Sequence, residues 1–83
     1  MNKITLITGA GRGIGYGIAK KFAENKNDLI LIIRKKEQLK KLLELGKKNK
    51  VNVKVIIGDL KNNRFIDKLN KLSRVDNLIN NAS

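Results

Sequence analysis

Five of the seven glycines fall within nine residues, at Gly9, Gly11, Gly13, Gly15 and Gly17. A short apolar run precedes them and a segment with helical spacing follows, so we expect a turn from a strand into a helix. Glycine permits positive φ angles and lets the backbone approach a ligand closely. The helix would present free N–H groups and its positive dipole end to an anion, typically a pyrophosphate. The cluster therefore predicts an anion-binding loop.

The alternative is a tight turn that binds nothing, but five glycines would weaken a fold that had no use for them. The spacing also separates this loop from two familiar motifs. Gly9-x-x-x-Gly13-x-Gly15 does not fit the G-x-G-x-x-G fingerprint, and no Gly-Lys-Ser/Thr follows, as the phosphate loop of nucleotide triphosphatases requires.

Basic residues follow the second apolar run, which ends at Ile33-Arg34-Lys35-Lys36 with no acid before Glu37. In dinucleotide-binding sheets an acid about 20 residues past the glycines binds the ribose 2′-hydroxyl of NAD, and an Arg there accommodates the 2′-phosphate of NADP. Guanidinium groups suit phosphate because they offer forked donors and stay charged. If the sheet binds a dinucleotide, Arg34 indicates NADP; the alternative is a solvated edge of a lysine-rich protein.

The composition excludes several classes of protein. The 83 residues include neither Cys nor His, which removes disulfides, thiol nucleophiles, zinc modules and histidine-dependent hydrolases, and we expect no metal site. Lys and Arg number 19 against seven acids, a formal charge of +12 that would suit nucleic acid. Aromatic residues are only 4%, however, and no nucleic-acid-binding signature is present, so this function is the less favoured one.

The elements that must position the loop alternate along the chain. Apolar runs predict strands, and apolar residues at spacings of three and four predict helices. This alternation favours an α/β fold with a parallel sheet and right-handed crossovers. No apolar run approaches the roughly 20 residues that cross a membrane, so we expect a cytoplasmic protein. The expected strands are Lys3–Thr8, Leu29–Ile33, Val51–Ile57 and Asn77–Asn80; the helices run from Ile14 to about Asn25, from Lys36 to Lys48 and from Phe65 to Leu72.

Three motifs resemble those of the short-chain dehydrogenase/reductase family. Residues 8–15 read TGAGRGIG and resemble its T-G-x-x-x-G-I-G signature. Asp59-Leu60 follows the third strand, where the family has an Asp that contacts the adenine ring. Residues 80–83 read NNAS and resemble its N-N-A-G, with Ser83 in place of the glycine. The three motifs stand in the family's order and extend over the whole chain.

The resemblance implies a partial Rossmann-type sheet, βαβαβαβ, in which residues 1–83 form the N-terminal part of an NAD(P)-binding domain that ends after the fourth strand. Basic residues at the positions of Arg12 and Arg34 mark a preference for NADP in this family. The cofactor-binding residues that the resemblance and the charges imply are Gly9, Gly11, Arg12, Gly13, Ile14, Gly15, Arg34, Asp59, Leu60, Asn81 and Ala82.

The family transfers a hydride between a nicotinamide and an alcohol or carbonyl carbon, using a Tyr, a Lys and a Ser. Those residues follow the Asn motif in the family, on elements that this chain does not contain. Tyr16-x-x-x-Lys20 has the spacing of the family's Tyr and Lys but falls in the first helix, where we interpret it as accidental. No catalytic residue is therefore assigned, and we expect an oxidoreductase fragment that is not active alone.

A second hypothesis is a non-catalytic dinucleotide-binding module. Such a module would associate with a separate C-terminal chain or with copies of itself. Ending after the fourth strand would leave that strand as an open, apolar edge, which favours pairing with another chain. We accordingly expect a product that is weakly stable or dependent on a partner.

Overall fold

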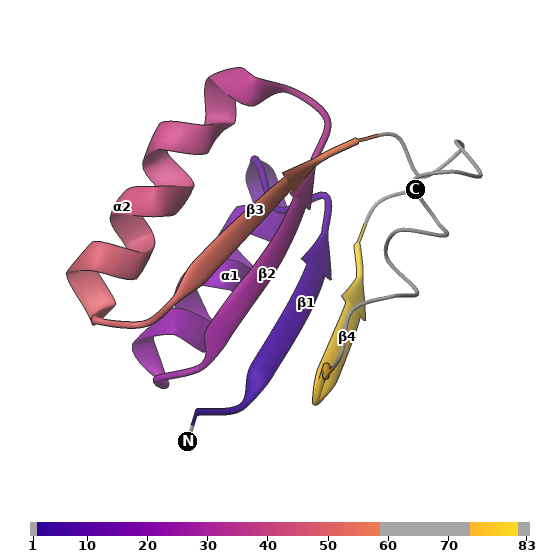
Figure 1. Ribbon diagram of the computed structural model, residues 1–83. Coiled ribbons are helices and arrows are strands. Elements are labelled where there is room, and N and C mark those ends of the chain that lie inside the picture. The colour runs from indigo at the N-terminus through magenta and orange to yellow at the C-terminus, as the bar shows by residue number, and fades with distance from the viewer. Residues whose placement is uncertain (1, 59–73, 82–83) are drawn as a thin grey trace.

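The computed structural model describes residues 2–58 and 74–81, which form a parallel sheet with two helices packed on it (Figure 1). The strand order is β3-β2-β1-β4. This arrangement confirms the Rossmann-type α/β fold. The third expected helix, Phe65–Leu72, lies outside the described residues. The elements are β1 (Ile4–Thr8), α1 (Gly13–Glu24), β2 (Asp28–Ile33), the 3₁₀ helix η1 (Lys36–Gln38), α2 (Leu39–Asn49), β3 (Val53–Ile57) and β4 (Asn77–Asn80).

The register brings the carboxyl ends of all four strands to one edge of the sheet. Thr8 of β1 pairs with Ile32 of β2 on one side and with Asn80 of β4 on the other, and Ile33 pairs with Ile57. The chain first builds the sheet to one side of β1 and then returns to its other side at β4. In open α/β sheets, ligands bind at the carboxyl edge beside such a reversal.

Both faces of β2 are buried, as its unbroken LILII sequence predicts. One face of the sheet packs against α1 and α2, and its core contains Ile7, Leu31, Ala19 and Leu42. The opposite face carries a second cluster formed by Leu6, Ile30 and Ile32. Side chains that alternate along the strands thus pack into two hydrophobic clusters, one on each face of the sheet.

A leucine in an amphipathic helix does not always lie in the core, as Leu43 shows. Its side chain is 42% exposed, whereas Leu42 and Leu45 are buried. Consecutive helical residues point about 100° apart, so only one of Leu42 and Leu43 can face the sheet. Ile4, Val53 and Val55 are half-buried at the periphery of the two clusters.

The start of β3 lies two residues later than the expected Val51 because a helix-ending turn intervenes. Lys50 adopts the left-handed conformation (φ 57°), and the N–H of Val51 donates to the carbonyl oxygen of Gly46 at 3.1 Å. Such a residue is a common end for an α-helix. Gly46 also lets α2 approach β3, since a β-carbon there would lie 2.8 Å from Cγ2 of Val53.

Candidate functional site: a glycine loop at the carboxyl edge

The glycine loop begins by turning over the end of β2. The backbone N–H groups of Gly9 and Ala10 both donate to the carbonyl oxygen of Ile32, at 3.0 and 3.3 Å. Gly9 and Gly13 have φ angles of +66° and +60°, which favour glycine strongly. The loop therefore needs glycine at these two positions to pass from β1 into α1.

Gly15 allows a close approach to backbone within the loop. A β-carbon on Gly15 would collide with the carbonyl oxygen of Gly9 and would lie 2.6 Å from Nδ2 of Asn81. The side-chain amide of Asn81 in turn donates to the Gly9 carbonyl oxygen at 3.3 Å. The first turn of α1 and the end of β4 are thus packed against the same peptide group.

A second set of hydrogen bonds ties β1 to the end of β4. The backbone N–H of Asn81 donates to Oγ1 of Thr8 at 3.0 Å, and that hydroxyl donates to Oδ1 of Asn80 at 3.1 Å. Thr8 is buried. The Thr8 and Asn81 side chains therefore hold the loop at the point where the strand order reverses.

The first turn of α1 presents backbone N–H groups at this edge. The first four N–H groups of an α-helix have no partner within the helix. Arg12 precedes α1 in an extended conformation and makes no capping hydrogen bond with its side chain, and no acidic residue lies in the first turn. These donors, together with the helix dipole, favour an anion such as a phosphate group.

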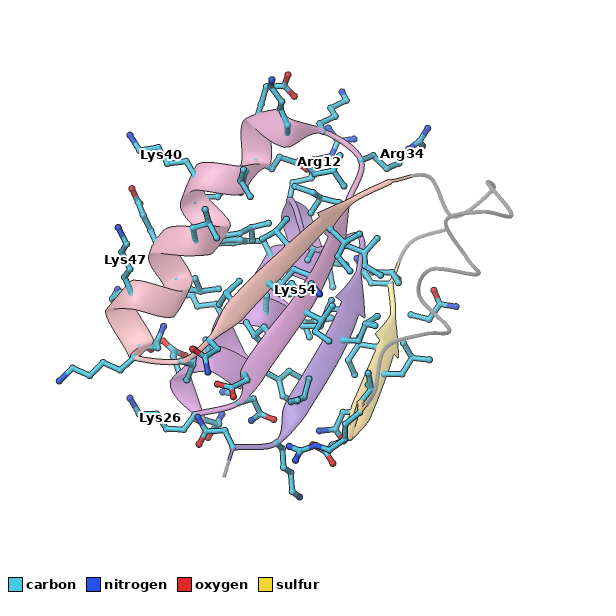
Figure 2. The ribbon with its side chains drawn as sticks, in the orientation of Figure 1. Arg12, Lys26, Arg34, Lys40, Lys47 and Lys54 are labelled. Atoms are coloured by element: carbon cyan, nitrogen blue, oxygen red, sulfur yellow. The ribbon has the colours of Figure 1, made fainter. Side chains whose placement is uncertain are left out.

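A cavity of about 430 Å³ lies beside the loop. Glycine backbone forms part of its wall, and the side chains of Arg12 and Arg34 line it from the loop and from the end of β2. Figure 2 shows both arginines at the same end of the sheet. The cavity therefore combines positively charged side chains with glycine backbone that a ligand can approach closely. Its lining residues are Gly9, Gly11, Arg12, Ile33, Arg34, Lys35 and Gln38.

The predicted residues divide into three groups. Gly9, Gly11, Arg12 and Arg34 line the cavity. The others that the structure describes lie beside it: Gly13 and Ile14 are exposed in the first turn of α1, with Ile14 78% exposed, while Gly15 and Asn81 support the loop from behind. Asp59, Leu60 and Ala82 lie outside the described residues.

Sequence reasoning missed Gln38, Ile33 and Lys35 as lining residues. Gln38 stands four positions after Arg34 and one before α2. Its position in the sequence could have placed it there, because the helix that follows β2 begins at the carboxyl edge of the sheet. The unexpected feature is the 3₁₀ turn of η1, which brings Gln38 to the cavity.

Tyr16 and Lys20 lie away from this cavity. They line a separate cleft at the contact of α1 with α2, where Nζ of Lys41 lies 4.5 Å from the centre of the Tyr16 ring. The ring also packs against the helix-side core. This packing agrees with the interpretation of Tyr16-x-x-x-Lys20 as an accidental match.

The amino edge of the same sheet is held by carboxylates. The backbone N–H of Asn52 donates to Oδ1 of Asp28 at 2.9 Å, which joins the start of β2 to the turn before β3. This hydrogen bond, assisted by one from the Asn2 side chain, holds the pKa of Asp28 below its ordinary value. The negative charge of Asp28 is thus used to fasten two strands.

Asp76 fastens β4 to β1 in the same way. The backbone N–H of Ile4 donates to Oδ2 of Asp76 at 2.7 Å, and the Arg74 guanidinium lies 3.2 Å from the same oxygen. The hydrogen bond from Ile4 and the charge of Arg74 both lower the pKa of Asp76. Both amino-edge carboxylates therefore accept backbone hydrogen bonds.

The described ranges, 2–58 and 74–81, contain neither a metal-binding cluster nor a membrane-spanning helix. Within these ranges no group of three or more His, Cys, Asp or Glu is placed to hold a metal ion. No helix of this part of the chain is long and apolar enough to span a membrane.

Comparison with known proteins places this chain in a family. Residues 3–83 match the family model described as short chain dehydrogenase. An 11-beta-hydroxysteroid dehydrogenase of Pinus massoniana is 38% identical over 89 residues, covering 96% of this chain and 24% of that protein. An 11-beta-hydroxysteroid dehydrogenase-like protein of Arabidopsis thaliana is 36% identical, covering 96% and 28%. The chain belongs to the short-chain dehydrogenase family, and it spans about a quarter of the length of these relatives.

Solved structures share the fold. A short-chain dehydrogenase from Sphingobium yanoikuyae in complex with NADPH superposes with a TM-score of 0.87 at 34% identity, covering 98% of this chain and 34% of that one. L-sorbose reductase from Gluconobacter frateurii, complexed with NADPH and L-sorbose, gives a TM-score of 0.88 at 28% identity, covering 99% and 34%. The sheet and its glycine loop thus correspond to the first third of each enzyme.

Proposed function

We propose that this chain supplies the adenosine and pyrophosphate side of the cofactor site of an NADP-dependent oxidoreductase of the short-chain dehydrogenase type. The observation that carries the proposal is the cavity that Arg12 and Arg34 line together with the glycine loop. The N-terminus of α1 offers a position for the pyrophosphate, and the two cations beside it offer one for the 2′-phosphate.

The residues present fit such a cofactor. Gly15 has no room for a β-carbon beside the Gly9 carbonyl oxygen, so the loop stays close to α1, and the N–H groups of the first turn of α1 are available to a pyrophosphate. Arg34 would bind the 2′-phosphate with forked donors, assisted by Arg12. The cofactor itself supplies hydride transfer to or from a carbonyl or alcohol carbon, and the residues for proton transfer would come from outside this chain.

The two NADPH-bound relatives support the choice of NADP over NAD, as does the order Ile33-Arg34-Lys35 at the end of β2. An acidic residue at the end of β2 would instead favour the free 2′-hydroxyl of NAD. The chain has its first acid after β2 at Glu37, which does not line the cavity.

The test is to measure the affinities of NADP⁺ and NAD⁺ for the full chain and for Arg34→Asp. We expect the variant to lose about tenfold to a hundredfold in NADP⁺ affinity, because a hydrogen bond to a charged group contributes roughly 1.5–3 kcal/mol. NAD⁺ affinity should hold or rise. The matched control is Lys54→Asp, which makes the same charge change at an exposed residue of β3 that does not line the cavity (Figure 2).

Equal losses in the two variants would show that net charge alone governs binding. Unchanged affinities for both dinucleotides in Arg34→Asp would contradict the assignment of the 2′-phosphate to Arg34. Circular dichroism of each variant reports whether the sheet and helices are retained.

A second candidate is a dinucleotide-binding module that works with a partner chain and performs no chemistry itself. The observation that favours it is the outer strand β4, which pairs with β1 alone among the described strands and leaves Leu78 66% exposed. The intact mass of the native protein distinguishes the candidates. A mass several times that of 83 residues supports the enzyme, whereas a mass matching 83 residues supports the module.

A further inference from the structure

Gln38 lies directly against the glycine loop. A β-carbon built on Gly11 would overlap the Gln38 carboxamide, with Oε1 and Cδ nearest and Nε2 at 2.8 Å. Gln38 is half-buried, and it lines the same cavity as Arg12 and Arg34. Because Gly11 has no side chain, the Gln38 carboxamide can occupy this space at the wall of the cofactor cavity.

The need for glycine at position 11 differs from the need elsewhere in the loop. Gly9 and Gly13 require positive φ angles, and Gly15 lies against backbone. Gly11 has neither constraint, because the three atoms nearest its hypothetical β-carbon all belong to the Gln38 side chain. An alanine could fit at position 11 if Gln38 moved away, since a long side chain can change rotamer at little cost.

The carboxamide has a chemistry that suits this place. It is neutral, offers two N–H donors and one carbonyl acceptor, and so can donate to a phosphate oxygen or accept from a hydroxyl group. A carboxylate of the same shape could only accept, and its charge would repel a phosphate dianion. The residue at position 38 can therefore shift the balance between a ribose 2′-phosphate and a 2′-hydroxyl.

We propose that Gln38, kept in the cavity by Gly11, contacts the ribose 2′-substituent and sets the preference for NADP over NAD together with Arg34. This inference rests on the proposed function and extends it to a residue pair. Gly11 acts here as a positioning residue for Gln38, and its lack of a side chain serves selectivity rather than the shape of the loop.

The first experiment measures NADP⁺ and NAD⁺ affinities of the full chain and of Gln38→Glu and Gln38→Met. We expect Gln38→Glu to lower the ratio of NADP⁺ to NAD⁺ affinity at least about tenfold, the equivalent of losing one hydrogen bond to a charged group. Gln38→Met, which keeps the length of the side chain but removes its donors, should lower the ratio less. Lys47→Gln is the control, because it lowers the net charge as Gln38→Glu does, at an exposed position of α2 outside the cavity (Figure 2).

The second experiment tests the pairing with Gly11→Ala in two backgrounds. In the wild-type chain, Gly11→Ala should lower the affinity ratio as Gln38→Ala does, while the thermal midpoint changes little. In the Gln38→Ala background, Gly11→Ala should cause no further loss. Such non-additivity is the signature of two residues that act through one contact.

Each outcome bears on the proposal. A ratio that Gln38→Glu leaves unchanged overturns it, as does a loss on Gly11→Ala that is equal in both backgrounds, because Gly11 would then serve the phosphate directly. If Arg34→Asp abolishes the NADP⁺ preference but every Gln38 variant retains it, this inference fails and the proposed function stands. A wild-type chain that binds neither dinucleotide overturns both.

Discussion

The two edges of the sheet use polar residues in opposite ways. At the amino edge, Asp28 and Asp76 accept hydrogen bonds from backbone N–H groups of neighbouring segments, so both carboxylates serve to hold strands together. At the carboxyl edge, Arg12 and Arg34 line a cavity beside the first turn of α1. The carboxylates of one edge bind backbone N–H groups of the protein itself, and the arginines of the other edge line a cavity of about 430 Å³.

This difference indicates that the carboxyl edge is available for ligand binding, whereas the polar residues of the amino edge stabilise the sheet. At the amino edge, the acidic side chains accept from the backbone N–H groups of Asn52 and Ile4, so they join neighbouring strands. The carboxyl edge has the helix N-terminus and the reversal of strand order, the features that make it the binding edge of open α/β sheets. Variants of the two arginines and of the two carboxylates should therefore separate loss of binding from loss of stability.

The largest effect is expected from Gly15→Ala, which should disrupt the carboxyl edge. Its β-carbon would collide with the Gly9 carbonyl oxygen and crowd Asn81, and backbone cannot move aside as a flexible side chain can. Overpacking of this kind costs about 3 kcal/mol of unfolding free energy. Chemical denaturation measures the loss, and NADP⁺ binding should disappear with it.

Gly17→Ala is the matched control for this prediction. It lies in the same helix, two residues later, with no atom within 4 Å of a β-carbon. Alanine favours helix over glycine by about 1 kcal/mol, so this variant should be more stable than the wild type. Destabilisation by Gly17→Ala equal to that of Gly15→Ala would contradict the close packing at Gly15.

A smaller effect is expected at the amino edge from Asp28→Asn. The pKa of Asp28 is lowered in the folded chain, so its carboxylate stabilises the fold above the unfolded-state pKa, about 4, and this contribution is lost as the pH falls through the lower, folded pKa. The variant should lose about 1 kcal/mol of stability at pH 7, and its unfolding free energy should converge with that of the wild type in acid.

Binding provides the second readout for Asp28→Asn. Since Asp28 lies at the opposite edge from the cavity, the affinity for NADP⁺ should match that of the wild type once the variant is folded. A selective loss of NADP⁺ affinity would contradict the claim that the amino edge contributes to stability and the carboxyl edge to binding.

The smallest effect is expected from Asp76→Asn. Its pKa is lowered by the backbone hydrogen bond from Ile4 and by Arg74, so its contribution is likewise present above about pH 4 and lost below the folded pKa. The group is exposed, and salt screens its pairing with Arg74. Thermal melts at low and high salt should show a difference from the wild type that shrinks with added salt; a difference that grows would contradict this account.

The local pattern was sufficient to predict the order of the elements and the loop. Five clustered glycines after a β-branched run indicated a strand-to-helix turn, and Arg34 at the end of β2 could be placed at the carboxyl edge because parallel strands end together there. Leu43 shows the limit within one helix, since a leucine repeat does not state which of two adjacent leucines faces the sheet.

Contacts distant in sequence could not be predicted in this way. Asp76 accepts from the N–H of Ile4, and Asn81 donates to Gly9, each across 72 positions, so both depend on the register of β4 beside β1. The contact of Gln38 with Gly11 depends in turn on the 3₁₀ turn before α2. These interactions follow from how the elements pack, which residue spacing alone does not specify.

The most direct test of the division between the edges is amide chemical-shift mapping of the ¹⁵N-labelled chain with adenosine 2′,5′-bisphosphate, which carries the 2′-phosphate of NADP. We predict shifts at the amides of residues 9–15 and 34–38 and none at Ile4 or Asn52, with weaker shifts when 5′-AMP replaces the bisphosphate. Shifts of equal size at Ile4 and Asn52, or an equal response to 5′-AMP, would contradict a 2′-phosphate site at the carboxyl edge.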